Sequence, residues 1–542
     1  MRKNLRHPRA KRGLDQRTWQ QQLDDFFAEQ QQPMQFPAAV QTQVRRMPDE
    51  PTAKDCRGRR DLTKLPLCTI DDETAQDFDD AVYGEAVDQQ LRVVVAIADV
   101  SHYVKPDTLL DTQAQKRAFS LYYPANCIPM LPHKLSAGLC SLKPDVTRLC
   151  VAVDMQIDAH GHIYKVDLYR AFMRSHARLT YKQVQQWIQP QGQPKQGSIP
   201  KTVTKSLTVL LQVSRLLRQI RQDKGSLRLH VPQHTVRLNA SGQPASIDET
   251  PRIEAYQLIE DLMIAANESV ARLAVRKKIP CLFRVHPAPK KEKLAQFVVI
   301  AQSLGAIASS LKFKPEQVTN RSLTRLHEHI IGKPLQGMLD PLLLRCMMQA
   351  SYSNQNTGHF GLASGCYAHF TSPIRRYPDL MVHRFLLSHI PPTAAASTKK
   401  LKLPTADQLQ ELAQHCNQRE REIMDTERQL ISMHQAWVMQ QYIAKTDSAV
   451  VVGCSAIGLF MQLKSFGATG LLPISKMGKR RIAFDAIRLR LIETATGHCI
   501  QMGDKLRVRI AGVHVSKGHV DLLPVRPVTC LRDLHVQSVQ NQ

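Results

Sequence analysis

An acidic segment, TIDDETAQDFDDAVYGE at residues 69–85, has the residue types and spacing best suited to chemistry. It places five aspartates within ten residues, namely Asp71, Asp72, Asp77, Asp79 and Asp80. Alternate side chains share a face in extended backbone, and a bend after Asp71 would bring a third carboxylate beside Asp77 and Asp79. Carboxylates this close repel one another, and a divalent cation removes the conflict. Mg²⁺ suits such a set because it prefers oxygen ligands and keeps waters that a phosphate can replace.

The same segment also fits a solvated acidic loop or a Ca²⁺-type site. Strand-like sequence on both sides and the composition of the chain favour a metal site that contacts a phosphate group of the substrate. The 542 residues include 73 Lys and Arg against 47 Asp and Glu, so the net charge is +26 and the pI is about 9.7. This surplus predicts a polyanionic partner, either nucleic acid or an anionic membrane surface. Hydrophobic residues make up 43% of the chain, which excludes a disordered basic protein.

A second segment, HFGLASGCYAHFTSPIRRYPDLMVHR at residues 359–384, contains Arg375 and Arg376. The planar fork of arginine can hold two oxygens of a phosphodiester. An arginine pair usually forms surface ion pairs, but this one lies among aromatic and apolar residues. We therefore expect at least one of the two to face inward toward an anionic partner, just before a helix that begins near Pro378 or Asp379.

Periodicity predicts the elements that must position these residues. Residues 91–100, LRVVVAIADV, are typical of a buried strand because of their β-branched content. The apolar spacing of residues 252–278 predicts a long helix with one buried face. Thr405 and Gln408 have the spacing of a capping box, which predicts a helix to about residue 443 after a loop at 390–404.

The two ends of the chain differ in character. Residues 1–56 are polar and rich in Gln, with an amphipathic helix expected within 15–33; their basic start is either a flexible tail or an arm that touches RNA. Residues 446–525 have short β-rich runs separated by glycines, which predicts a small barrel. Between 446 and 520 there are 11 Lys or Arg against 4 Asp or Glu, so this barrel is strongly basic.

Several classes of protein are excluded. The apolar runs are far shorter than the roughly 20 residues of a membrane-spanning helix. The basic start has no apolar stretch behind it, so it is not a secretory signal. The 12 cysteines form no C-x-x-C pair and have no zinc-finger spacing. We expect reduced core thiols in a cytoplasmic protein rather than disulfides.

The two segments resemble the motifs of the RNB family of exoribonucleases, the ribonuclease II and ribonuclease R group. TIDDETAQDFDDA is similar to the metal-binding motif of the family, and YAHFTSPIRRYPDLMVHR is similar to its downstream signature. The resemblance covers about residues 57–442 and is closer to the ribonuclease R branch. Nearer the C-terminus, GLFMQL, TGLLPISKM and GDKLRVRI resemble an S1-type OB-fold.

The resemblance implies an α+β fold class. A catalytic RNB domain with a mixed β-sheet core and helices would be followed by a small all-β OB-fold barrel of the S1 type. The expected domains are an N-terminal extension at 1–56, the catalytic domain at 57–445 with the helical segment 405–443, the barrel at 446–525 and a tail at 526–542.

The resemblance also implies an activity, processive hydrolysis of single-stranded RNA from the 3′ end to nucleoside 5′-monophosphates. The family uses Mg²⁺, here expected in a two-metal site, with Mn²⁺ as a possible substitute. The residues assigned to metal binding and catalysis are Asp71, Asp77, Asp79 and Asp80, joined by Arg375 at the scissile phosphate. The residues assigned to RNA binding are Tyr122, Arg376, Glu427 and Phe460. Packing within a loop is the other interpretation of Tyr122, and packing in the barrel core is that of Phe460.

Two departures from the family pattern qualify these expectations. Family members usually carry two cold-shock OB-folds before the catalytic domain, whereas about 56 residues precede it in this sequence. We therefore expect a weaker grip on RNA and altered handling of structured RNA. Leu229 stands where the family has an aromatic base-stacking residue, so the clamp on the terminal nucleotides should be looser.

We expect a monomer whose partner is single-stranded RNA and which does not associate with a membrane. Two other hypotheses remain open. One is an inactive RNA-binding scaffold with this fold, and the other is a nuclease that prefers DNA or another phosphodiester.

Overall fold

The computed structural model describes residues 17–30, 34–88, 90–189, 199–390 and 404–534. The chain divides into two compact units. The first, here called the sheet unit, comprises residues 35–233 and 250–425. The second, the barrel unit, comprises the chain up to Met34, residues 234–249 and the chain from Thr426 onward. No helix within the described ranges is long and apolar enough to cross a membrane. All 12 cysteines are free thiols, and six of them are buried.

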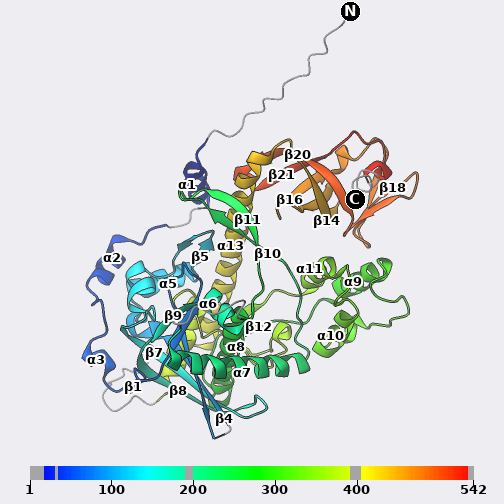
Figure 1. The fold of residues 1–542 in the computed structure, drawn as a ribbon. Helices are drawn as coiled ribbons and strands as arrows, with labels where there is room; N and C mark the ends of the chain where they lie inside the picture. The colour runs from blue at the N-terminus through cyan, green and yellow to red at the C-terminus, as the bar shows by residue number, and fades with distance from the viewer. Residues whose placement is uncertain (1–16, 31–33, 89, 190–198, 391–403, 535–542) are drawn as a thin grey trace, which may run out of the picture. The chain divides into compact units, whose positions relative to one another are not determined.

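A seven-stranded mixed sheet forms the centre of the sheet unit (Figure 1), in the order β1-β8-β7-β4-β3-β2-β9. Its strands are β1 Arg60–Asp61, β2 Cys68–Asp71, β3 Asp80–Val87, β4 Gln90–Ala98, β7 Thr147–Ile157, β8 Ile163–Arg174 and β9 Ala177–Thr180. The middle strands pair antiparallel, whereas β1 with β8 and β2 with β9 are parallel. The strand expected at 91–100 is therefore confirmed as β4, which is buried along nearly all its length.

Helices and short hairpins complete the sheet unit. The helices are α2 Ala38–Arg45, α3 Ala53–Cys56, α4 Val100–Tyr103, α5 Leu109–Arg117, α6 Tyr181–Ile188, α7 Lys201–Asp223, α8 Glu254–Lys277, α9 Lys291–Ser303, α10 Asn320–Glu328, α11 Gln336–Cys346 and α12 Tyr377–Ser388. The hairpin strands are β5 Leu121–Tyr123 with β6 Asn126–Ile128, and β12 Phe283–Val285 with β13 Ser351–Ser353. Helix α12 begins one residue before the predicted Pro378.

Helices α7 and α8 lie against the sheet (Figure 1) and against each other. The Gly84 backbone N–H on β3 donates to Ser206 Oγ on α7 at 2.8 Å. Asp261 of α8 is buried and accepts hydrogen bonds from Ser214 and Arg218 of α7. Helix α8 matches the helix predicted at 252–278, but the prediction of one buried face is wrong. Most of its surface is buried because the sheet, α6 and α7 all pack against it.

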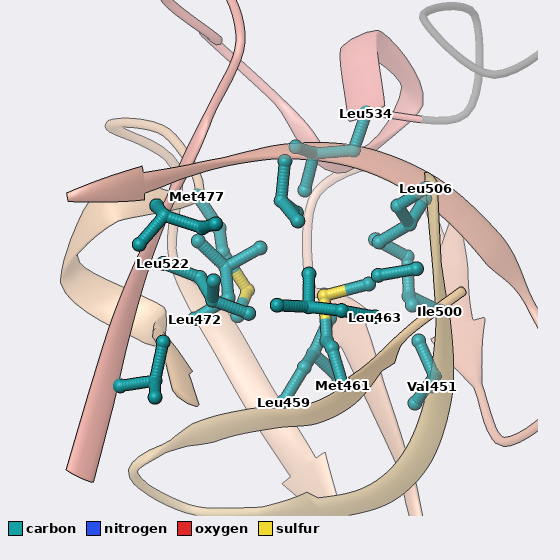
Figure 2. Close-up of a cluster of buried hydrophobic side chains, with 14 of the residues drawn as sticks. Val451, Leu459, Met461, Leu463, Leu472, Met477, Ile500, Leu506, Leu522 and Leu534 are labelled. Carbon is teal, nitrogen blue, oxygen red and sulfur yellow. The ribbon is translucent and has the colours of Figure 1, made fainter. Parts of the chain in front are cut away.

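The barrel unit contains a closed five-stranded barrel in the order β14-β15-β16-β21-β20. Its strands are β14 Thr446–Ser455, β15 Gly458–Leu463, β16 Thr469–Pro473, β20 Lys505–His514 and β21 His519–Pro524. Figure 2 shows the core, in which Leu459, Met461 and Leu472 meet side chains from the opposite strands. Gly458 is required at its position because its φ is 151° and an added Cβ would lie 2.2 Å from the Leu472 carbonyl oxygen. The predicted barrel and the α+β fold class are confirmed.

Smaller elements extend the barrel unit. A three-stranded sheet follows β16 in the chain and consists of β17 Ile482–Asp485, β18 Arg490–Glu493 and β19 Cys499–Gln501. Strands β10 Gln233–Leu238 and β11 Pro244–Thr250 form a hairpin, and α1 Trp19–Glu29 lies within the stretch predicted as an amphipathic helix. The Trp19 ring packs against His434 and Trp437 of α13, which spans Ala406–Met439. Thr405 and Gln408 form the predicted capping box. Most of the loop expected at 390–404, and Pro33, lie outside the described residues.

A buried ion pair fixes the end of β4. Arg59 Nη2 lies 2.7 Å from Asp99 Oδ2, and the two side chains are 5% and 0% exposed. Burial alone would raise the pKa of Asp99, but Arg59 and Arg170 hold it well below its usual range. Because this pKa is lowered by folding, the stabilisation is present at neutral pH and is lost only as the pH falls to strongly acidic values.

Replacing Arg59 tests this pair. We expect Arg59→Met to lower the free energy of unfolding by about 3–5 kcal/mol, because Asp99 is left buried without its closest cation and keeps only weaker partners such as the partly exposed Arg170 and the Ser101 hydroxyl. Urea denaturation at pH 7 measures the change. Adding Asp99→Leu should recover most of the loss, and a single variant as stable as the wild type would contradict the assignment.

Candidate active site

A cavity of about 500 Å³ in the sheet unit is lined by the acidic segment. The lining residues are Asp71, Asp72, Ala75, Asp77, Asp79, Asp80, Tyr122, Tyr181, Ile259, Glu260, Met263, Ile264, Asn267, Leu362, Tyr367, Thr371, Ser372, Arg375 and Arg376. The fold therefore brings together the four predicted aspartates, both arginines and Tyr122. They come from parts of the sequence that are up to 300 residues apart.

The aspartates are held in place by a loop between two strands. Asp71 ends β2 and Asp80 begins β3. Between them the backbone is irregular, and Ser141 fixes it by accepting from Phe78 N at 3.0 Å and donating to Gln76 O at 2.7 Å. The Asp79 carbonyl accepts from Ala98 N at 2.9 Å. These contacts hold the carboxylates near one another despite their repulsion.

Three of these carboxyl groups have raised pKa values. Burial is the largest cause for each. The pKa of Asp71 rises to about 6, to which the charge of Asp77 adds. The pKa of Asp79 rises to about 7, although Arg375 and the Ile374 N–H oppose the rise. The pKa of Asp80 is raised well above its usual value, with Asp71 and Asp79 adding to the effect of burial. The cavity therefore carries more negative charge than the protein neutralises.

Arg375 supplies part of the missing positive charge. Its Nε lies 3.3 Å from Asp79 Oδ2, and its Nη2 donates to Ser372 Oγ at 3.1 Å. The other Asp79 oxygen accepts from Ile374 N at 2.9 Å. The Arg375 side chain remains 44% exposed, so part of the guanidinium is open to an incoming anion.

Arg376 has a different environment. It forms a bidentate pair with Asp379 of α12, at 2.9 and 2.7 Å, and the Asp379 side chain is fully buried. The expectation that one arginine of the pair faces inward toward an anion is confirmed, and that anion is a carboxylate of the protein. The predicted contact of Arg376 with RNA stays a prediction.

Tyr122 faces the cavity. Its hydroxyl donates to Asp77 Oδ2 at 2.9 Å, and the side chain is 36% exposed. The backbone just before it is joined to the arginine segment, because Ser120 N donates to Arg375 O at 3.0 Å. Packing within a loop is therefore not the main environment of Tyr122, and the ring is placed beside the carboxylates.

Other predicted residues lie elsewhere. Phe460, on β15 of the barrel unit, is 38% exposed while its neighbours Leu459 and Met461 are buried in the core, so core packing is excluded for Phe460. Glu427 lies on α13 in the barrel unit, and its role stays a prediction. Leu229 is half-buried and does not line the cavity; its carbonyl accepts from Arg252.

Six polar side chains of the cavity outside the acidic segment were not predicted: Tyr181, Glu260, Asn267, Tyr367, Thr371 and Ser372. Tyr181 comes beside the aspartates because β9 pairs with β2, so that Thr180 is opposite Asp71. Nothing local in the sequence indicates that pairing. Glu260 and Asn267 lie seven residues apart on α8 and hence on one face, which is a signal that could have identified them.

The donor set fits a divalent cation. Among the residues that the structure describes, no three His, Cys, Asp or Glu side chains are already arranged as a metal site. Asp77 and Asp79 are instead engaged with Tyr122 and Arg375. All the candidate donors are carboxylate oxygens, which Mg²⁺ and Mn²⁺ prefer. The pKa values of Asp71, Asp79 and Asp80 are raised chiefly by burial, and a nearby cation would favour the charged form of each.

Comparisons with known proteins agree with this site. The model of the RNB domain matches residues 59–391. The chain belongs to the RNB-domain family. It is 36% identical over 494 residues to ribonuclease R of Escherichia coli strain K12, a match that covers 90% of this chain and 60% of that protein. The chain therefore spans about 60% of the length of the curated relatives that it matches first.

Solved structures of RNB-family and similar folds resemble this one. A structure titled as Mycoplasma genitalium RNase R in complex with ribose methylated single-stranded RNA superposes with a TM-score of 0.86 at 28% identity, over 93% of this chain and 77% of the other. A structure titled as yeast Ssd1, a pseudonuclease, gives 0.67 at 17% identity, over 88% and 58% of the two chains, and at that identity shows only a shared fold.

Replacing one aspartate of the cavity by asparagine tests whether the carboxylates repel one another and bind a metal ion. Without divalent ions at pH 8, we expect Asp80→Asn to melt at a higher temperature than the wild type, because repulsion with Asp71 and Asp79 is relieved. Adding MgCl₂ should raise the melting temperature of the wild type more than that of the variant. Thermal unfolding followed by circular dichroism measures both changes. Asp167→Asn, an exposed control on β8, should show neither effect, and an unchanged wild type in Mg²⁺ would contradict the metal assignment.

Proposed function

We propose that this chain is a Mg²⁺-dependent 3′→5′ exoribonuclease that hydrolyses single-stranded RNA processively to nucleoside 5′-monophosphates. The observation that carries the proposal is the meeting of buried, mutually repelling aspartates with a half-exposed arginine in one cavity. Such a site attracts metal ions and phosphate together. Membership in the RNB-domain family, and relatives named ribonuclease R, support RNA as the substrate.

Each residue of the site has a definite part. Asp71, Asp77, Asp79 and Asp80 would hold the metal, which when bound supplies a hydroxide nucleophile and stabilises the leaving 3′-oxygen. Arg375 neutralises the non-bridging phosphate oxygens as negative charge develops. Asp79 and Ser372 keep its guanidinium at the cavity wall before RNA arrives.

Tyr122 orients the 3′ end. Its ring is exposed at the cavity and offers a surface on which a base can stack, while its hydroxyl holds the Asp77 carboxylate in one orientation. A base stacked there would lie close to both the aspartates and Arg375. The terminal nucleotide is thus positioned by a contact that does not depend on its sequence.

The barrel is proposed to gather the substrate. Its segment from 446 to 520 has an excess of seven basic residues over acidic ones, 11 against 4, which attracts the RNA backbone. Phe460 points outward from β15, where it can stack on a base. Capture by the barrel and chemistry at the aspartates are therefore separate tasks of the two units.

Two other functions must be weighed against this one. The fold alone does not decide activity, since a protein described as a pseudonuclease shares it. This chain, however, has all four aspartates and Arg375 at the cavity, which favours an active enzyme over a scaffold. A preference for DNA is decided by assay, because a contact to the 2′-hydroxyl separates the two substrates.

The activity is tested with RNA labelled at its 5′ end. In Mg²⁺ we expect progressive shortening from the 3′ end, a short labelled end product and nucleoside 5′-monophosphates. Asp79→Asn should abolish turnover, and Arg375→Ala should lower kcat by roughly 10²–10³-fold because charge on the phosphate is no longer neutralised. Asp167→Asn serves as the matched control and should retain full activity. Equal cleavage of DNA of the same sequence would refute the RNA assignment, and an Asp79→Asn variant as active as the wild type would refute the site.

The role of Phe460 is tested by affinity. Losing the ring in Phe460→Ala should weaken binding of single-stranded RNA by about 1–3 kcal/mol, whereas kcat at saturating RNA should not change. Fluorescence anisotropy at several salt concentrations measures the effect, and the salt slope should be preserved because no charge is removed. Ile487→Ala, which truncates another exposed apolar side chain of the barrel unit, is the control. Unchanged affinity in Phe460→Ala would remove Phe460 from the RNA-binding surface.

A further inference from the structure

The segment that leads to Arg375 is buried but has no regular secondary structure. Residues Tyr367–Ser372 contain no helix or strand, and Phe370 is completely buried. Buried backbone groups need hydrogen-bond partners, and here no neighbouring strand supplies them all. Side chains from two helices take that place. They are Asn267 of α8, and Asp379 and His383 of α12.

Asn267 makes all its hydrogen bonds to this segment. Its Oδ1 accepts from Phe370 N at 2.8 Å, and its Nδ2 donates to the Tyr367 hydroxyl at 3.0 Å and more weakly to Thr371 Oγ1 at 3.4 Å. The residue is 2% exposed, so water cannot replace these contacts. One side chain thus contacts this irregular loop at three residues.

Helix α12 holds the opposite side of the same residues. His383 Nε2 lies 2.8 Å from the Phe370 carbonyl oxygen, and its ring stacks on the Phe370 ring with centroids 4.0 Å apart. Ser372 N donates to Asp379 Oδ1 at 2.9 Å. The Phe370 peptide groups are therefore fixed by α8 through the N–H and by α12 through the carbonyl.

The fixed loop ends at the groups that contact the acidic cavity. Ser372 Oγ accepts from Arg375 Nη2, and Ile374 N donates to Asp79. A shift of Phe370 would move Ser372 and Ile374, which follow it closely in the chain, and would thereby change both contacts. Displacing a catalytic group by about 1 Å can cost 10²-fold in rate even when the altered residue is remote from the chemistry.

We propose that Asn267 is a positioning residue for the chemical step and acts by setting the Arg375 guanidinium against the aspartates. The inference rests on the proposed function and adds to it a residue that does not belong to either sequence motif. Leucine has the same branched arrangement of heavy atoms as asparagine but offers no acceptor. Asn267→Leu would leave the Phe370 N–H buried without a partner, and the loop would move to satisfy it.

A double-mutant cycle tests the proposal. Asn267→Leu should lower kcat by about 10–100-fold with KM for RNA unchanged within about twofold. In the Arg375→Ala background the same substitution should lower kcat by no more than about threefold, because the group that it positions is gone. Fully additive losses, or a change confined to KM, would overturn the proposal.

Control variants separate positioning from a general loss of structure. Ser206→Ala also removes an acceptor from a buried backbone N–H, that of Gly84, and should leave kcat unchanged whatever its effect on melting temperature. If Asn267→Leu does not fold, Tyr367→Phe removes only one hydroxyl partner of Asn267. It should give a smaller loss in kcat that also disappears in the Arg375→Ala background, and an additive loss would overturn the proposal.

A second readout keeps the inference distinct from the proposed activity. Phenylglyoxal modifies exposed guanidinium groups, and mass spectrometry of the peptide that contains Arg375 gives the rate at which this arginine is modified. Asn267→Leu should change that rate at least threefold, whereas Ser206→Ala should not. If the wild type cleaves no nucleic acid, the proposed function fails, and this rate alone decides the positioning role. An unchanged rate would then overturn it.

Discussion

Repulsion among buried carboxylates is the constraint on which the rest of this structure depends. Asp71, Asp79 and Asp80 meet at the junction of β2 and β3, and burial is the main cause that raises the pKa of each. Repulsion from Asp77 adds to the rise for Asp71 and Asp79, and repulsion from Asp71 and Asp79 adds to it for Asp80. Arg375 supplies only part of the compensating charge. The free energy that holds the carboxylates together must come from the surrounding fold, above all from the nearly continuous burial of β4 and β7. Under the proposed function, cations and phosphate would supply the positive charge and the contacts that this site lacks.

The same constraint explains the distribution of charge along the chain. A net charge of +26 would draw RNA toward any part of the surface, yet aspartates at the cavity repel its phosphates. In the proposed function, cations would lie between the protein and the scissile phosphate. The exposed Phe460 and the basic side chains of the barrel, which belong to a different unit of the chain from the carboxylates, would bind the strand. Local acid within a basic chain marks the place of chemistry.

The sequence predicted the elements with local signals well. Strand β4, the capping box at Thr405 and the five-stranded barrel all follow from periodicity or short motifs. Long-range packing accounts for the failures. Helix α8 is buried on most sides because three partners surround it, which its own sequence does not reveal. Arg376 pairs with Asp379, only three residues along the chain, and its contact with RNA stays a prediction. No local signal joins Tyr122 to Asp77, because 45 residues separate the two partners of this hydrogen bond. Only the resemblance to a family assigned Tyr122 to the site.

Counting bound metal tests the central claim most directly. Mn²⁺ in solution gives an electron paramagnetic resonance signal that falls when the ion binds, so a titration yields both stoichiometry and affinity. We predict saturable binding of one or two Mn²⁺ per wild-type chain, competition by Mg²⁺, and affinity lowered by roughly tenfold or more in Asp80→Asn. Binding that does not saturate, or that is equally tight in Asp80→Asn, would contradict the account, because the buried carboxylates would then have another source of compensation.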